Sequence, residues 1–421
     1  MAGGKQGTVN SRERLLRTIR HEKPDHVPLV CPCFGFAPPP PLRWKQQGRE
    51  VAHWYTMRLE HIHTLPEPWG VEDDFERVLQ WLSLGLDDAL DVSPPWGIHP
   101  EVRIRDWQEA PTAAEPYRLL CREYQTPAGP LQHIVRRTDE KISPGWVVQP
   151  DHVPLFEDFN VPRGVKHAVA GPEDLPKLRY LLQEPTTNQL SDYRARMAIV
   201  RRFAKEQGVL VQGWSGFGMD AVAWLCGVER AIVAAMIEPE FFRALLDVVE
   251  DFDRRRTEMM LDLGGVDMVV ARGWYSGTDF WSPALFRKFL TPNLKTSAGL
   301  AHQAGALFAY VMTTGALAMS EQLLAADIDL LYFVDPLQEK TDLALVKDKF
   351  SGRLSVAGGI SSAVTLCTGS REDICQAVHT AVRKLGPTSF ILAPVDALFP
   401  DTPWPSVEAM IEAWKDVCEL G

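Results

Sequence analysis

Eight short apolar segments alternate with longer amphipathic segments along most of this chain. Several are apolar almost throughout, such as Val-Leu-Val at 209–211 and Leu-Leu-Tyr-Phe-Val at 330–334. Strands of a parallel sheet that is covered on both faces have this pattern, whereas half-exposed strands alternate apolar with polar residues. The sequence therefore predicts eight buried strands, at residues 27–31, 86–92, 209–214, 266–271, 306–312, 328–334, 354–357 and 390–395.

The segments between these strands have apolar residues three and four positions apart, as on one face of an α-helix. An earlier helix is expected from Ser11, as its cap, to the Lys23-Pro24 pair, because the residue before a proline resists helical geometry. Strands that alternate with helices predict a (β/α)8 TIM barrel, although a doubly wound sheet would show the same local pattern. The main helices are expected at residues 221–237, 241–263, 283–302, 371–385 and 407–420.

The chain between the second and third expected strands is too long for a single helical connection. Residues 118–124 and 131–138 flank a turn rich in proline and glycine, which predicts a β-hairpin. The proline-rich residues 142–162 predict a loop over the mouth of the barrel. We therefore expect one domain over residues 1–421, with a hairpin and loop insertion at about residues 96–165, after the second strand.

The charge balance limits the partners of the chain. It has 44 Lys and Arg residues against 55 Asp and Glu residues, a net charge of -11 at pH 7. Such a surface repels phosphate backbones and anionic membranes, so we expect neither nucleic acid nor a membrane as a partner. No membrane span or signal peptide is recognisable, and the seven irregularly spaced cysteines suit reduced thiols. These features predict a cytoplasmic protein.

Five motifs follow one another in a fixed order along the chain: Ser11-Arg-Glu-Arg-Leu-Leu with Glu22-Lys-Pro-Asp-His-Val-Pro28, Trp281-Ser-Pro-Ala-Leu-Phe-Arg-Lys-Phe-Leu-Thr-Pro292, Ala357-Gly-Gly-Ile-Ser361, Phe390-Ile-Leu-Ala-Pro394 and Pro403-Trp-Pro-Ser-Val-Glu-Ala-Met410. Together they resemble the uroporphyrinogen decarboxylase superfamily, whose members are (β/α)8 barrels, so the resemblance implies that fold. Two further segments, Glu123-Tyr-Gln-Thr-Pro-Ala-Gly129 and Gly171-Pro-Glu-Asp-Leu-Pro-Lys-Leu178, resemble its corrinoid-linked methyltransferase-like branch more than the haem-pathway decarboxylases.

The sequence departs from both branches of this superfamily at their functional motifs. The decarboxylases carry an arginine-rich turn after the first strand, where this chain reads Cys31-Pro-Cys-Phe-Gly-Phe-Ala-Pro38. The methyltransferase branch often binds zinc through His-x-Cys and a later Cys, where this chain has Tyr310, Met312 and the Pro394-Val-Asp-Ala397 segment. If zinc is a cofactor here, other ligands must hold it, and the candidates are Cys31, Cys33 and Asp335.

Aromatic and polar residues follow the expected strands, at the end of a barrel where active sites lie. Trp214, Trp274 and Tyr275 offer ring faces to a small, flat substrate, and Asp279 and Phe34 are further candidates for binding it. The alternative is that the three rings only cap the core, since aromatic residues are common core fillers. Asp279, equally, has the position of a helix cap or a turn residue.

Four residues are candidates for catalysis. Asp335 ends an apolar strand, where an ionised carboxylate is costly unless it is paired, protonated or bound to metal. Asp396 follows the last strand and could join Asp335 across the barrel mouth. We expect Asp335 or Tyr310 to handle protons or a metal, with Asp396 as a further candidate acid or base, and Arg272 to meet a carboxylate or phenolate.

Three functions are compatible with these residues. The resemblance implies corrinoid-linked methyl transfer, a demethylation of a small aromatic substrate, with a separate corrinoid protein as methyl acceptor. The first alternative is a decarboxylase of a small carboxylic acid or of a uroporphyrinogen-like substrate. The second is a non-catalytic barrel that binds a small molecule. Barrels of this type often pair, and the acidic surface does not forbid a homodimer.

Overall fold

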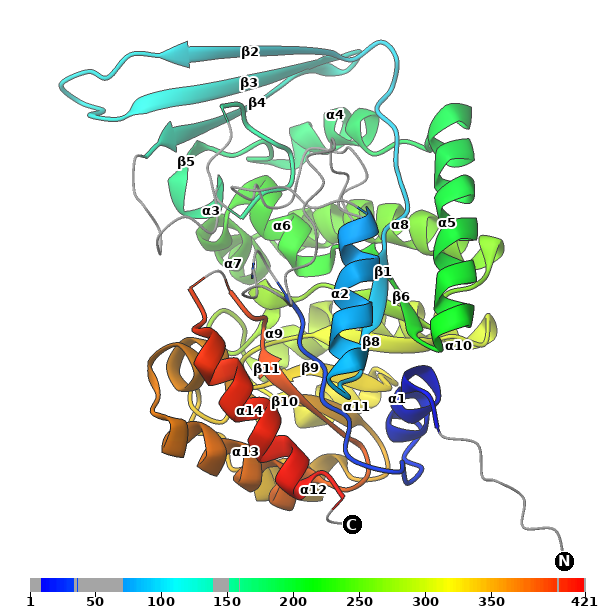
Figure 1. Cartoon of the computed structure of the whole chain (residues 1–421). Helices are drawn as coiled ribbons and strands as arrows, with labels where there is room; N and C mark the ends of the chain where they lie inside the picture. Colours follow the sequence, from blue (N-terminus) through cyan, green and yellow to red (C-terminus); the bar gives the residue numbers. More distant parts are fainter. Residues whose placement is uncertain are drawn as a thin grey trace, which may run out of the picture.

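A seven-stranded parallel sheet forms the centre of the protein in the computed structural model, which describes residues 9–33, 36, 71–138, 151–158, 160–399 and 401–419. Neighbouring strands follow one another along the chain, as expected for repeated βα units, and the sheet curls into a half-barrel (Figure 1). In sheet order the strands are β1 (Ala89–Val92), β6 (Leu210–Gly216), β7 (Met268–Ala271), β8 (Leu307–Val311), β9 (Leu330–Val334), β10 (Ser355–Ser361) and β11 (Phe390–Val395).

The first expected strand, residues 27–31, forms isolated bridges rather than a regular strand. Leu29 pairs in parallel with Leu392 of β11, and Val30 pairs with Asp87, just before β1. This segment therefore contacts both edges of the seven-stranded sheet. The other seven expected strands and the parallel α/β arrangement are confirmed, whereas a full eight-stranded barrel stays a prediction.

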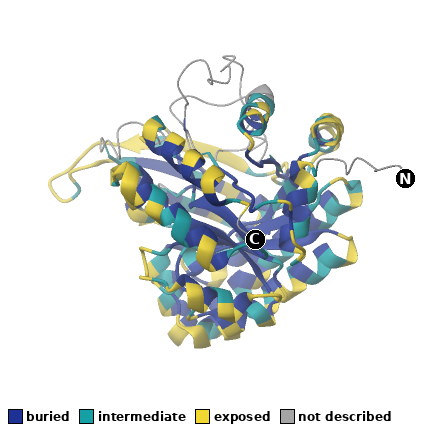
Figure 2. Cartoon of the chain, turned by 60° about the horizontal axis from the view of Figure 1, so that its bottom comes forward, coloured by how far each residue is buried: buried dark blue, intermediate teal, exposed yellow. Residues whose placement is uncertain are grey.

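Helices cover the outer face of the sheet, and their exposed sides face outward (Figure 2). Two expected helices are interrupted: one at Gly227, which has a φ of 78° that suits glycine, and one at Leu290. The helices that surround the sheet are α1 (Ser11–Ile19), α2 (Val71–Ser83), α5 (Thr187–Gln207), α6 (Gly218–Cys226), α7 (Val228–Ile237), α8 (Pro239–Leu263), α9 (Pro283–Phe289), α10 (Thr291–Gln303), α11 (Ser320–Ala325), α12 (Leu343–Phe350), α13 (Arg371–Leu385) and α14 (Trp404–Val417).

A four-stranded antiparallel sheet lies in sequence between β1 and β6 and stands at one end of the molecule (Figure 1). It consists of β2 (Arg103–Glu109), β3 (Arg118–Thr126), β4 (Gly129–Arg137) and β5 (Gly164–Lys166). The pairing of β3 with β4 confirms the expected hairpin, whereas β2 and β5 were not expected. Part of the expected loop at 142–162 lies outside the described residues.

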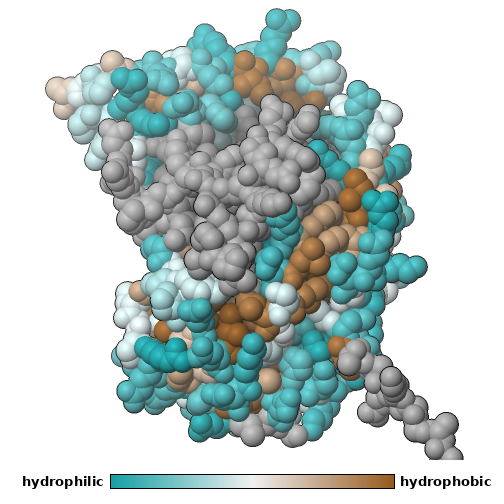
Figure 3. All heavy atoms as spheres, in the orientation of Figure 1, coloured by the Kyte–Doolittle hydropathy of each residue, from teal (hydrophilic) through white to brown (hydrophobic). Residues whose placement is uncertain are grey.

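The apolar core has two main parts. One lies between the sheet and the helices, and the other fills the concave side of the sheet, where Trp214 and Trp274 pack against it. The face in Figure 3 has several hydrophobic areas among mostly hydrophilic residues. Leu79 of α2 is one of the exposed hydrophobic residues, with 43% of its surface accessible. Of the helices in the described ranges, none has the length and hydropathy needed to cross a membrane.

Candidate functional site

A cavity of about 340 Å³ opens at the carboxyl ends of the central strands. Asp91 reaches it from β1, Trp214 from β6, Arg272 and Trp274 from the segment after β7, and Asp396 from the residue after β11. In a parallel α/β sheet this edge is where substrates bind. The full lining is Val30, Pro32, Cys33, Asp74, Arg77, Asp88, Ala89, Asp91, Asp158, Gln212, Trp214, Arg272, Trp274, Tyr275, Tyr332, Phe333, Asp396, Ala397 and Phe399.

Two tryptophans, each hydrogen-bonded to an aspartate, form one wall of this cavity. The Trp214 and Trp274 rings are stacked, with centroids 6.1 Å apart and planes inclined by 14°. Nε1 of Trp214 donates to Oδ1 of Asp91 at 2.8 Å, and Nε1 of Trp274 donates to Oδ1 of Asp396 at 2.8 Å. The indole bonds fix both the ring planes and the carboxylates, so the wall combines a flat apolar surface with two oriented acids.

Burial shifts the acids of the cavity towards their protonated forms. It raises the pKa of Asp91 and of Asp396 above the ordinary value, against the opposing effect of the indole hydrogen bonds and of nearby arginines. Burial also raises the pKa of Asp88 to about 6, although Nη1 of Arg77 lies 2.9 Å from both of its oxygens. The cavity therefore holds carboxyl groups that bind protons more readily than an exposed aspartate does, and Asp88, with a pKa of about 6, titrates close to neutral pH.

Arg272 stacks on the Trp274 ring of this wall. Its guanidinium is 4.4 Å from the centre of the Trp274 ring, and its Nε donates to Oδ2 of the buried Asp220 at 3.1 Å. Burial raises the pKa of Asp220 to about 7, and the charge of Arg272 opposes that rise. The arginine is thus stacked and paired within the protein before any substrate binds.

The structure brings five of the residues expected from the sequence, and one candidate metal ligand, to this cavity. Trp214, Trp274 and Tyr275, expected to bind substrate, all line it, as do the expected catalytic residues Arg272 and Asp396 and the candidate ligand Cys33. The two tryptophans also pack on the core below, so a core-capping role and a lining role coincide in the same rings.

Other expected residues lie elsewhere. Asp335 is buried and accepts hydrogen bonds from the backbone N–H groups of Leu337 at 2.7 Å and Gln338 at 3.3 Å, so it fixes the turn after β9. Asp279 is exposed and its Oδ2 accepts a hydrogen bond from Thr314. Tyr310 lines a different cavity.

Tyr310 is buried and donates a hydrogen bond to Oγ of Ser276 at 2.6 Å. Burial raises the pKa of its phenol, so it remains protonated at neutral pH. Cys31 is buried next to the cavity but is absent from the lining within the described residues. Phe34 lies outside the described residues.

Sequence reasoning missed the acidic side of the cavity. Arg77, Asp88, Asp91, Gln212 and Tyr332 line it, yet none was expected there. The available signal was the presence of three aspartates within the otherwise apolar 86–92 segment, where ionised side chains are costly without a function or a partner.

The described residues do not fit a zinc site. Cys33 donates a hydrogen bond to the Cys31 carbonyl oxygen at 3.3 Å, and burial raises the pKa of Cys33 to about 12 and that of Cys31 well above its ordinary value. Zinc binds the thiolate, which this environment disfavours. Throughout the described ranges, no three His, Cys, Asp or Glu side chains are placed to share a metal ion.

Comparison with known proteins identifies the fold. The structure is similar to that of a methyltransferase from Methanosarcina mazei, with a TM-score of 0.54 and 16% identity over 97% of this chain and 98% of that one. A B12-independent methionine synthase from Shewanella sp. matches at a TM-score of 0.42 and 10% identity, over 94% of this chain and 97% of that one. Curated protein sequences give no significant match.

The sequence itself matches a family model. The model describes uroporphyrinogen decarboxylase (URO-D), and the match extends over residues 156–417, which include six of the seven central strands. The chain therefore belongs to the uroporphyrinogen decarboxylase (URO-D) family.

Proposed function

We propose that this protein transfers a methyl group from a small methoxylated aromatic compound to a reduced corrinoid carried by a separate protein. The observation that carries the proposal is the stacked Trp214–Trp274 wall, in which each indole N–H holds a carboxylate of the same cavity. A methyltransferase among the proteins of similar fold supports the reaction class. A closed eight-stranded barrel, with residues 27–31 as its first member, is part of the same proposal.

The charge of the cavity favours a substrate without multiple negative charges. Five aspartates and two arginines line it. Arg77 is paired with Asp88, and Arg272 with Asp220, so neither cation is left to attract an acidic substrate. A tetrapyrrole with many carboxylates would be repelled, whereas a neutral aromatic ring can lie against the indoles.

Asp396 is the proposed proton donor. Its Oδ1 accepts the Trp274 hydrogen bond, which leaves its second oxygen for the substrate. When bound, the corrinoid supplies the nucleophile that takes the methyl group. The methyl–oxygen bond breaks, its electron pair stays on the substrate oxygen, and that oxygen receives the proton of Asp396 to leave as a phenol. The raised pKa of Asp396 favours the protonated form that this step needs.

The test is demethylation of 2-methoxyphenol with cob(I)alamin as the methyl acceptor, followed through the release of catechol. We expect Asp396→Asn to lower kcat by about 10²–10⁴-fold, the usual contribution of a general acid, with KM changed much less. Asp348→Asn, at an exposed position of α12, is the matched control and should retain the wild-type kcat. A wild-type kcat in Asp396→Asn would refute the assigned role, and no catechol from the unaltered protein would refute the reaction.

A further inference from the structure

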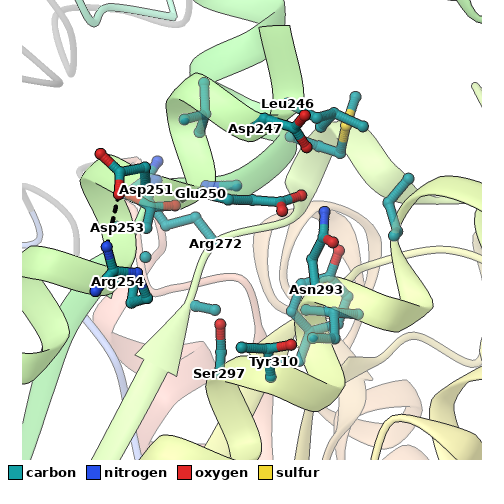
Figure 4. A pocket seen from close by; sticks show the side chains of 18 of the residues that line it. Leu246, Asp247, Glu250, Asp251, Asp253, Arg254, Arg272, Asn293, Ser297 and Tyr310 are labelled. Carbon is teal, nitrogen blue, oxygen red and sulfur yellow. Dashed lines mark hydrogen bonds and ion pairs between the residues drawn. The ribbon is translucent and has the colours of Figure 1, made fainter. Parts of the chain in front are cut away.

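A second cavity, of about 260 Å³, lies between helices α8 and α10 (Figure 4). It is separate from the candidate site, although Arg272 lines both. One side is acidic and comes from α8, and the other is apolar or neutral and comes mainly from α10. None of the functions discussed above uses it.

The acidic side presents four carboxylates, Asp247, Glu250, Asp251 and Asp253. The two cations of the lining are already engaged within the protein: Arg254 pairs with Asp251 and Glu258, and Arg272 pairs with Asp220. The carboxylates of Glu250 and Asp253 therefore lack a compensating positive charge from the lining. Because they are three residues apart, these two side chains lie on the same face of α8.

Both of these carboxylates have an oxygen that no described group satisfies. Asp253 is 8% exposed, and its Oδ2 accepts from the backbone N–H groups of Phe217 at 2.9 Å and Gly218 at 2.8 Å. Its Oδ1 has no hydrogen-bond partner among the described residues, and neither has Oε1 of Glu250. Figure 4 shows Glu250 reaching from α8 towards Asn293 of α10. Buried acceptors without donors are costly, and a ligand with N–H groups would satisfy them.

The opposite side of the cavity suits a short hydrocarbon. Leu290, Leu294 and Leu300 line it, together with the neutral polar residues Asn293 and Ser297. We propose that this cavity binds a small alkylammonium ion, with the ammonium group between Glu250 and Asp253 and the alkyl chain against the leucines. A cation fits because the net charge of the lining is negative, and an alkyl body fits because its far wall is apolar.

The protonation of Glu250 provides a second signature of such a ligand. Its pKa is raised to about 8: burial is the main cause, the charge of Arg243 opposes the rise, and the charges of Asp247 and Asp253 add to it. Helix α10 contributes no titratable side chain to the lining, and the remaining charged or titratable groups there are Asp251, Arg254, Arg272 and Tyr310. An ammonium ion favours ionised Glu250, so binding near pH 7 should release a proton from it.

The experiment is calorimetric titration of the protein with n-butylamine hydrochloride, and with butan-1-ol as a neutral molecule of similar shape. Both titrations are made at pH 7.2 in phosphate and again in HEPES, because the difference in binding heat between the two buffers reports the number of protons released. We expect saturable binding of the amine with net proton release, and binding of the alcohol at least tenfold weaker. Equal binding of both compounds, or no saturable binding of the amine, would overturn the proposal.

Two variants test the position of the ligand. Glu250→Gln, which keeps the shape of the side chain, should weaken amine binding at least tenfold and abolish the proton release. Ser297→Phe should block the cavity with the same loss of binding. Asp262→Asn, at an exposed position of the same helix outside the cavity, is the matched control and should bind as the unaltered protein does. Unchanged binding in Glu250→Gln would overturn the assignment. The titration requires no methyl transfer, so its outcome is independent of the proposed function.

Discussion

Replacing His133 should reduce the acid sensitivity of the protein. His133 lies in β4 with 0% exposure, and neither ring nitrogen has a hydrogen-bond partner among the described residues. Burial lowers its pKa from 6.5 to about 3, and the charges of His167 and Arg122 act in the same direction. The folded protein therefore keeps this imidazole neutral at a pH where the unfolded chain protonates it.

The sign and size of the effect follow from proton linkage. Below pH 6.5 the unfolded state takes up a proton that folded His133 does not, so the free energy of unfolding falls as the pH falls towards about 3. Each pH unit in that interval costs about 1.4 kcal/mol, so the loss between pH 6.5 and pH 5 is about 2 kcal/mol. His133→Leu removes this contribution because leucine has no proton to bind.

The assay is urea unfolding followed by tryptophan fluorescence at pH 7 and pH 5. We expect the loss of stability between the two pH values to be about 2 kcal/mol smaller in His133→Leu than in the unaltered protein. His99→Leu, a change at a half-buried histidine, controls for the removal of any imidazole. Equal losses in His133→Leu and the unaltered protein would refute the reasoning.

Three further predictions follow from the site and the fold. Trp274→Leu removes the hydrogen bond to Asp396 and half of the stacked wall, so KM for 2-methoxyphenol should rise about tenfold; an unchanged KM in steady-state kinetics would contradict this. Arg77→Met leaves Asp88 buried without its guanidinium, which should cost about 3–5 kcal/mol in chemical unfolding, and adding Asp88→Asn should recover part of that loss. Gly227→Ala places a side chain at a φ of 78°, so thermal unfolding should show destabilisation of at least about 1 kcal/mol, and an unchanged midpoint would argue against it.

The strands and most helices could be predicted because burial on both faces imposes a visible apolar pattern. The helix break at Gly227 was missed, since an isolated glycine in an apolar helical pattern does not show whether its φ is positive. The position of Trp214 and Trp274 after their strands was enough to place both in one cavity, because their large rings pack on the core at the carboxyl ends of the strands.

Strand-end position could not decide where a carboxylate points. The Asp335 side chain accepts a hydrogen bond from a backbone amide of the turn that follows it, whereas the Asp396 side chain, also at a strand end, lines the cavity. Asp88 was overlooked because its partner Arg77, 11 residues earlier, lies in α2, which was not among the expected helices. Asp91 was overlooked because its partners are remote in sequence. Trp214, for example, lies 123 residues from the carboxylate of Asp91 that it contacts. Such pairing depends on the three-dimensional register of the strands, which a single sequence does not reveal.

Arg272 is part of the wall of both cavities, and this has a thermodynamic consequence. If a ligand between α8 and α10 alters the Arg272–Asp220 pair, the affinity of the site above the strands changes by some factor. Reciprocity then requires that occupancy of that site changes the affinity between the helices by the same factor. A single buried guanidinium would thus make two chemically different ligands allosteric effectors of each other.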